Sequence, residues 1–128
     1  MESEFRALLL NDQQLSQLVG NRISWVSHPQ GRAFPALVLT VISLAEGLSL
    51  TGRDGLSAGR VQVDCYAKTY TEAKQVSRAV VSALHGHRGG GFRVVTHVGT
   101  RDSREGGTNE AERLFRVSLD FTTSWRSQ

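Results

Sequence analysis

Cysteine, proline and lysine are scarce in this chain. Among 128 residues there are one cysteine, two prolines and two lysines. A single cysteine, Cys65, cannot form an internal disulfide, and without a second thiol nearby it cannot build a thiolate metal site. We therefore expect the fold to be held together by the packing of apolar side chains.

Long apolar runs are missing as well. A membrane-spanning helix needs about 20 consecutive, mostly apolar residues, and no segment approaches that length. The chain starts with the acidic sequence Met-Glu-Ser-Glu, and no apolar stretch of the length of a secretory signal follows it. We expect no membrane partner and a protein that stays in the cytoplasm in which it is made.

Charge of one sign is not in large excess. Thirteen arginines and two lysines oppose 12 acidic residues, which leaves a net charge of +3. The excess is uneven, because residues 1–64 carry a net charge of −1 and residues 65–128 a net charge of +4. This near balance does not by itself indicate a nucleic-acid-binding protein, and any surface that faces an anion is expected in the second half.

The first third of the chain predicts two short helices and a short strand. Apolar residues recur at helical spacing over residues 3–19, but a polar stretch at 11–14 divides the stripe in two. Asn11 and Gln14 match a capping box for the second piece, and Gly20 suits its left-handed stop. A short strand is expected at residues 22–26.

Four further strands and one helix are predicted after Pro35. Residues 36–44 are apolar on both alternating faces, so we expect both faces of that strand to be covered. Residues 60–67 alternate, with Val61, Val63, Cys65 and Ala67 on one face. Thr69 and Glu72 match a second capping box, before a helix that ends at Gly86. Residues 92–98 and 114–125 are expected to form the last two strands.

Two long connections are predicted between these strands. Residues 46–59 contain four glycines, and residues 99–112 are almost wholly polar. We expect both to be loops that are mobile in the free protein and become ordered against partners. The candidate partner-contact residues in these loops are Leu48, Leu50, Arg53, Asp54, Leu56, Arg101, Arg104 and Glu105.

The order of the elements is α-β-β-β-α-β-β, which differs from the order in doubly wound α/β proteins. We therefore predict an α+β fold in which two principal helices pack on one face of a mainly antiparallel sheet. The length suits a single domain that spans residues 1–128.

No set of residues predicts catalysis, a metal site or a cofactor. The sequence GHRGGG at 86–91 lacks the Lys-Ser/Thr pair of a phosphate-binding loop and follows a helix, so it predicts a turn. The four histidines have no matching carboxylate pattern. For a small enzyme, Asp64, Asp120 and His97 are the only candidates. A salt bridge between either aspartate and Arg60 or Arg116 is the more ordinary role.

Several phrases in a fixed order resemble a known family. They are LSQLVGNRI at 15–23, FPALV at 34–38, VQVDCYA at 61–67, TEA at 71–73 and FRVSLDF at 115–121. In this order and spacing, nearly the whole chain is similar to the tail completion, or tail terminator, proteins of long-tailed bacteriophages and related prophage and gene-transfer particles.

The resemblance implies a structural virion protein without enzymatic activity. Such a protein forms a ring, usually a hexamer, that caps the tail tube, stops its growth and offers a surface for docking to the head. Its implied partners are other copies of itself, the major tail tube protein and a head–tail connector or stopper protein. DNA would make only transient, non-specific contact. A head-completion or neck component is the nearest alternative, and a small nucleic-acid-binding α+β domain is a more distant one.

Overall fold

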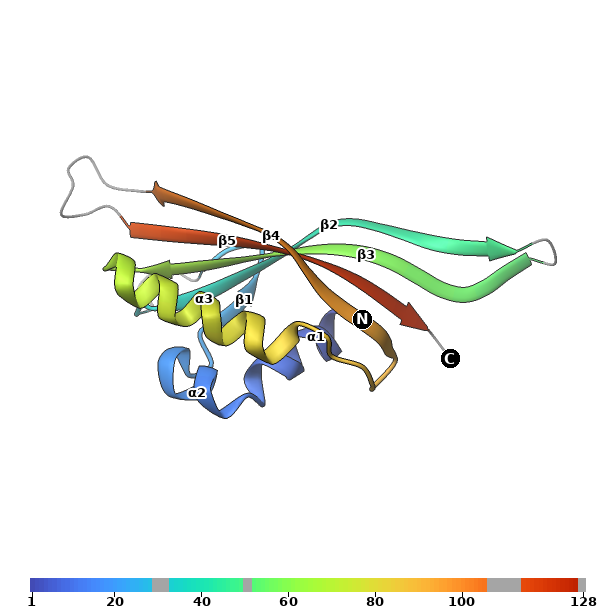
Figure 1. The fold of residues 1–128 in the computed structure, drawn as a ribbon, viewed down its shortest axis with the longest axis horizontal. Coiled ribbons are helices and arrows are strands. Elements are labelled where there is room, and N and C mark those ends of the chain that lie inside the picture. Colours follow the sequence, from blue (N-terminus) through green and yellow to red (C-terminus); the bar gives the residue numbers. More distant parts are fainter. Residues whose placement is uncertain (29–32, 50–51, 106–113, 127–128) are drawn as a thin grey trace.

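The computed structural model describes residues 1–28, 33–49, 52–105 and 114–126; for residues 46–49, 52–56 and 105 it describes the backbone only. Helices α1 (Glu2–Leu10) and α2 (Gln13–Val19) precede a five-stranded sheet, and helix α3 (Tyr70–Leu84) lies between its third and fourth strands in the chain. The three helices pack on one face of the sheet, as Figure 1 shows. The predicted α+β class is confirmed.

The sheet has the strand order β1-β2-β3-β5-β4. The strands are β1 (Ile23–Trp25), β2 (Ala36–Ser49), β3 (Gly52–Ala67), β4 (Phe92–Glu105) and β5 (Leu114–Arg126). Every neighbouring pair is antiparallel except β1 and β2, which run parallel. The short first strand is therefore an edge strand that covers only the start of β2.

The caps of the helices follow the predicted chemistry with one correction. Thr69 Oγ1 accepts a hydrogen bond from Glu72 N at 3.2 Å, as expected for the start of α3. At α2 the capping residue is Asp12 and not Asn11, because the Asp12 carboxylate accepts from Leu15 N at 3.0 Å. Asn11 has helical backbone angles as the C-cap residue of α1, and an N-cap needs the extended angles that Asp12 has.

The core lies between the three helices and the sheet. Phe5 of α1 is fully buried, and its ring centroid lies 6.3 Å from that of Phe92 and 6.4 Å from that of Phe121. From α3, Val76, Val80 and Leu84 are completely buried. This confirms the predicted helix face.

Where the structure describes them, the two predicted loops are wrong as loops, because residues 46–49, 52–59 and 99–105 continue the strands. β2 and β3 form a hairpin whose ladder extends to the pair Ser49 and Gly52, and β4 pairs with β5 as far as Glu105 and Leu114. The backbone of a ladder is satisfied by its neighbour whatever the side chains are, so glycine and polar residues did not prevent pairing. Residues 50–51 and 106–113 lie outside the described part of the chain.

The glycines at 89–91 form a turn. Their φ angles are 127°, 57° and 97°, in the left-handed region that glycine adopts at little cost. The Trp125 ring lies directly over Gly91, in the space that a side chain at this position would occupy. The segment joins α3 to β4, and so the prediction of a turn is confirmed.

Leu84 provides a test of the core. We expect Leu84→Ala to lower the free energy of unfolding by about 2–5 kcal/mol, because it removes a fully buried side chain and leaves a cavity. Chemical denaturation monitored by circular dichroism measures the change. Ser82→Ala, on the exposed side of the same helix, is the matched control and should change stability little. Equal stability of the two variants would contradict this packing.

Candidate functional site: the open face and the projecting hairpin

The sheet face opposite the helices, called here the open face, carries a network of buried charge. Asp64 on β3 is nearly buried, and Arg116 on β5 donates from Nε to its Oδ1 at 3.0 Å. Ser118 Oγ donates to the same oxygen at 2.6 Å, and Gln62 Nε2 donates to both carboxylate oxygens at 3.0 Å. The carboxylate is thus fully engaged in a structural network.

A second carboxylate on this face is held in the same way. Asp120 on β5 is nearly buried, forms an ion pair and hydrogen bond with Arg101 of β4, and lies 3.7 Å from Arg60 Nη2 of β3. The predicted salt bridges of Asp64 and Asp120 to Arg116 and Arg60 are confirmed. Both carboxylates are buried although no helix covers this face, because the long arginine side chains lie over them.

The three candidate catalytic residues do not form one site. Asp64 and Asp120 lie on the open face, whereas His97 faces the helices, with its ring centroid 5.3 Å from that of Phe121. Cys65 is also on the helix side and fully buried, and burial raises the pKa of its thiol well above the usual range. The geometry therefore places no nucleophile beside a base among these residues.

An exposed cluster ties α3 to β4. Lys74 Nζ donates to Asp102 Oδ1 at 2.9 Å, and Tyr70 Oη donates to Asp102 Oδ2 at 2.9 Å. The hydrogen bond from Lys74, followed by that from Tyr70, lowers the pKa of Asp102, and the same contact raises the pKa of Lys74. Both shifts favour the charged forms, so this is a surface ion pair that fixes the position of β4.

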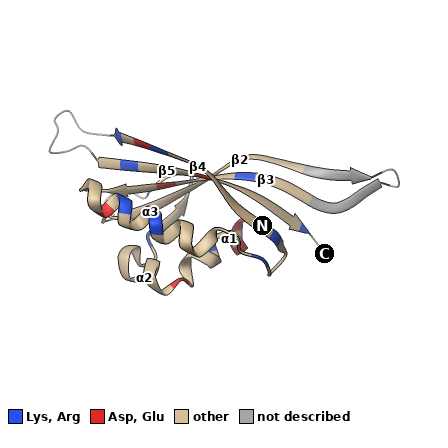
Figure 2. Ribbon diagram, in the orientation of Figure 1, with Lys and Arg blue, Asp and Glu red and all other residues tan. Residues whose placement is uncertain are grey.

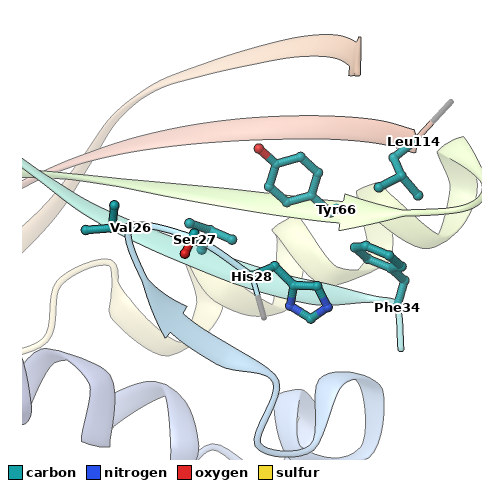
Figure 3. A pocket seen from close by; sticks show the side chains of 7 residues that line it. Val26, Ser27, His28, Phe34, Tyr66 and Leu114 are labelled. Carbon is teal, nitrogen blue, oxygen red and sulfur yellow. The ribbon is translucent and has the colours of Figure 1, made fainter. Parts of the chain in front are cut away.

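A recess of about 280 Å³ lies where the segment after β1 meets the sheet (Figure 3). Its lining is mostly apolar and aromatic, with the His28 and Phe34 ring centroids 4.7 Å apart. The residues that line it are Val26, Ser27, His28, Phe34, Val38, Tyr66 and Leu114. Such a lining suits an apolar side chain better than a charged substrate.

The β2–β3 hairpin projects beyond the helices (Figure 1). On its β2 strand, Ile42 and Leu44 are 50% and 52% exposed, although their sequence predicted cover on both faces. That expectation holds for the first half of β2, where Leu37, Val38 and Leu39 are buried, and is wrong for the second half, which the helices do not reach. Residues 36–45, the part of this strand whose side chains the structure describes, contain no charged residue (Figure 2).

The predicted contact residues fall at the two ends of the sheet. Leu48, Arg53, Asp54 and Leu56 belong to the projecting hairpin, and Leu50 lies outside the described residues. Arg101, Arg104 and Glu105 belong to β4 at the opposite end. The sequence interpretation missed Ile42, Leu44 and the half-exposed Val98. Residues 36–44 are apolar on both faces, and this pattern could have identified Ile42 and Leu44 as contact residues.

The described residues contain no cluster of three or more potential metal-ligating side chains. Within the same part of the chain, no helix is both long and apolar enough to cross a membrane. The described surface has an extended sheet with a projecting hairpin, an apolar recess and, on the open face, arginines paired with Asp64 and Asp120.

These features suit a protein that works through its surfaces, and the comparisons identify its class. The profile of the family "Tail completion protein gp17" matches residues 3–125, so the chain belongs to this family and is a structural component of phage-type tails. A solved chain from the "Virion of native gene transfer agent (GTA) particle" has the same fold, with a TM-score of 0.73 at 19% identity. The alignment covers 96% of this chain and 92% of that chain. No curated protein matches the sequence.

The buried ion pair of the open face gives a stability test. We expect Asp64→Ala to lower the free energy of unfolding by about 1–3 kcal/mol, because it removes the ion pair with Arg116 and leaves the buried Ser118 hydroxyl without its acceptor. Asp102→Ala is the matched control; it removes an exposed ion pair with Lys74 and should cost only about 0.2–1 kcal/mol. Equal losses in urea unfolding would show that the open-face network contributes no more than a surface pair.

Proposed function

We propose that the protein is a tail terminator. Copies of it form a ring, six in number, which caps the completed tail tube, stops its growth and presents the surface that docks to the head. Membership of the tail completion family supports this role over nearly the whole chain. The likeness in fold to a chain of a gene transfer agent virion is consistent with it.

The observation that carries the proposal is the projecting hairpin. β3 has 16 residues and extends well past the helices, and the apolar Ile42 and Leu44 beside it are about half exposed. A monomer gains nothing from exposing these apolar side chains on an extended hairpin in water, whereas a neighbouring subunit can bury them. Closed rings use two different complementary surfaces on each subunit, and this chain has distinct surfaces at the two ends of its sheet.

The partners of such a ring are further copies of the chain, the major tail tube protein and a head–tail connector or stopper protein. Its place is the head-proximal end of the tail in the virion, and assembly occurs in the host cytoplasm. The proposed role requires no cofactor and no chemical step, since binding alone stops tube growth.

The open face argues against tight binding of DNA. Arg101 and Arg60 are paired with Asp120, and Arg116 is paired with Asp64, so much of the arginine charge is already neutralised. A ring on the path of the genome must let a polyanion slide through. Paired arginines suit transient contact with DNA without any reading of its sequence.

Deletion of the gene in a producing strain tests the role. We expect tails of uncontrolled length that do not join heads, because nothing would stop polymerisation of the tube. Restoring the gene is the control and should restore uniform tails. Tails of normal length that fail only to attach would favour the alternative of a head-completion or neck component. Native mass measurement of the tail-bound protein should show a hexamer, and a strict monomer there would overturn the ring.

DNA binding gives a separate test. We expect weak binding of duplex DNA at physiological salt, with no preference among sequences. Asp120→Asn removes the single negative charge that Arg60 and Arg101 share, so the slope of log affinity against log salt should become steeper by up to about 0.9, for one further phosphate contact. Fluorescence anisotropy across a salt series measures the affinity for DNA and its dependence on salt. Submicromolar, sequence-selective binding by the unaltered protein would favour the nucleic-acid-binding alternative.

A further inference from the structure

One edge of the sheet is open along most of β2. β1 pairs with Leu37, Val38 and Leu39, and Val26 N then donates to Leu39 O at 2.7 Å. From residue 40 to residue 49, no described residue pairs with the outer edge of β2. This stretch contains no proline, lysine or arginine, which are the residues that usually protect an edge strand from pairing with another chain.

The opposite edge of the sheet is open over the other half of its length. The first half of β4 is covered by the segment after α3: Gly86 N donates to Val95 O at 2.7 Å, and Val95 N donates to His87 O at 3.0 Å. His97 N donates to Nδ1 of His85 at 3.0 Å. From residue 99 to residue 105, β4 is the last strand of the sheet, and no described strand pairs with its outer edge.

The two open edges are complementary in direction. β2, β3, β5 and β4 alternate in direction across the sheet, so β2 and β4 run opposite to each other. If a second copy is placed in the same orientation beyond β2, its β4 lies antiparallel to β2. Antiparallel pairing is slightly the more stable kind and needs no rearrangement of either copy.

The positions of the open edges require a stagger between copies. Thr40, Gln62, Asp120 and Gly99 form one row across the sheet. Placing Glu105 of one copy beside Thr40 of the next therefore moves the copies by about six residues, or roughly 20 Å, along the strands. From one joint to the next each copy contributes four strands, β2, β3, β5 and β4, or about 19 Å, because β1 lies beyond β2 on the same edge as β4 of the next copy. The strands therefore tilt by about 46° from the ring axis, which is close to the upper end of the range for closed barrels. Closed β-barrels have tilts of about 35–45°.

The side chains beside the two edges also fit. Leu44 lies on the helix side of β2, in the row of Gly59 and Thr123. On the same side of the β4 edge is a recess of about 190 Å³, lined by Tyr70, Asp102, Ser103, Arg104 and Phe115. The Tyr70 ring is 46% exposed, and its centroid lies 5.9 Å from that of Phe115. The stagger brings Leu44 beside Asp102 of the next copy, at this aromatic recess.

We propose that adjacent subunits join edge to edge, with residues 40–46 of β2 in one copy paired antiparallel with residues 99–105 of β4 in the next, so that the sheets form one continuous, staggered barrel. This inference rests on the proposed ring and specifies how it closes. The occupant of each open edge is a second copy, because the two open edges of this chain are complementary to each other in direction and similar in length.

Paired cysteines test the stagger directly. In the proposed register Ser43 lies opposite Ser103 of the next copy, since the extra residue Ile42 sits in a bulge of β2. Both serines are exposed on the open face. Within one chain they are separated by at least three strand spacings, about 14 Å, which is too far for a disulfide. Tails purified with the Ser43→Cys/Ser103→Cys variant should show, under mild oxidation, a non-reducing ladder that extends to the full ring.

The controls separate the stagger from other arrangements. Ser43 and Thr96 share a row, so sheets joined without a stagger would crosslink Ser43→Cys/Thr96→Cys instead. Each single variant should give at most dimers. The native Cys65 is fully buried and should not form a crosslink. A ladder from the Thr96 pair, or none from either pair in tails whose ring is seen by mass, would overturn the staggered edge and leave the terminator role intact. Absence of any ring would instead overturn the proposed function.

Discussion

A difference in length between the helices and the sheet underlies most of this structure. α3 has 15 residues and is about 22 Å long, whereas β3 has 16 residues and spans about 53 Å. Three short helices can therefore cover only part of one sheet face. The covered part forms the core around Phe5, and the remainder projects as a hairpin whose apolar residues no helix can reach.

On the open face, which no helix covers, the buried carboxylates are paired with arginines. Asp64 and Asp120 are buried beneath arginines that reach across from neighbouring strands, and the bonds from Gln62 and Ser118 complete the coordination of Asp64. Removing one partner of such a network costs more than removing an exposed ion pair. The network stabilises one register of β3 against β5 and leaves the face polar, so it need not be covered by another layer.

Much of the fold was predictable because local signals were strong. The Thr69 cap, the helical spacing of Val76, Val80 and Leu84, and the strict alternation at 60–67 each predicted an element that the structure contains. The hairpin was not predictable in the same way. Its glycines and polar residues are typical of loops, and the backbone ladder that makes them strands, as between Leu48 and Arg53, leaves no pattern in the side chains. The same applies to the end of β4, where Arg101 and Arg104 lie in a strand beside β5.

The sequence by itself determined the class of the fold, the core side of α3, the resemblance to the tail completion family and the pairing of charge on β3 and β5. Periodicity and capping are local properties, so they can be read without coordinates. Only the tertiary structure decided which strands lie side by side, how far the hairpin extends beyond the helices and which edges stay open. These depend on long-range register and on the relative lengths of packed elements, which neighbouring residues in the chain do not encode.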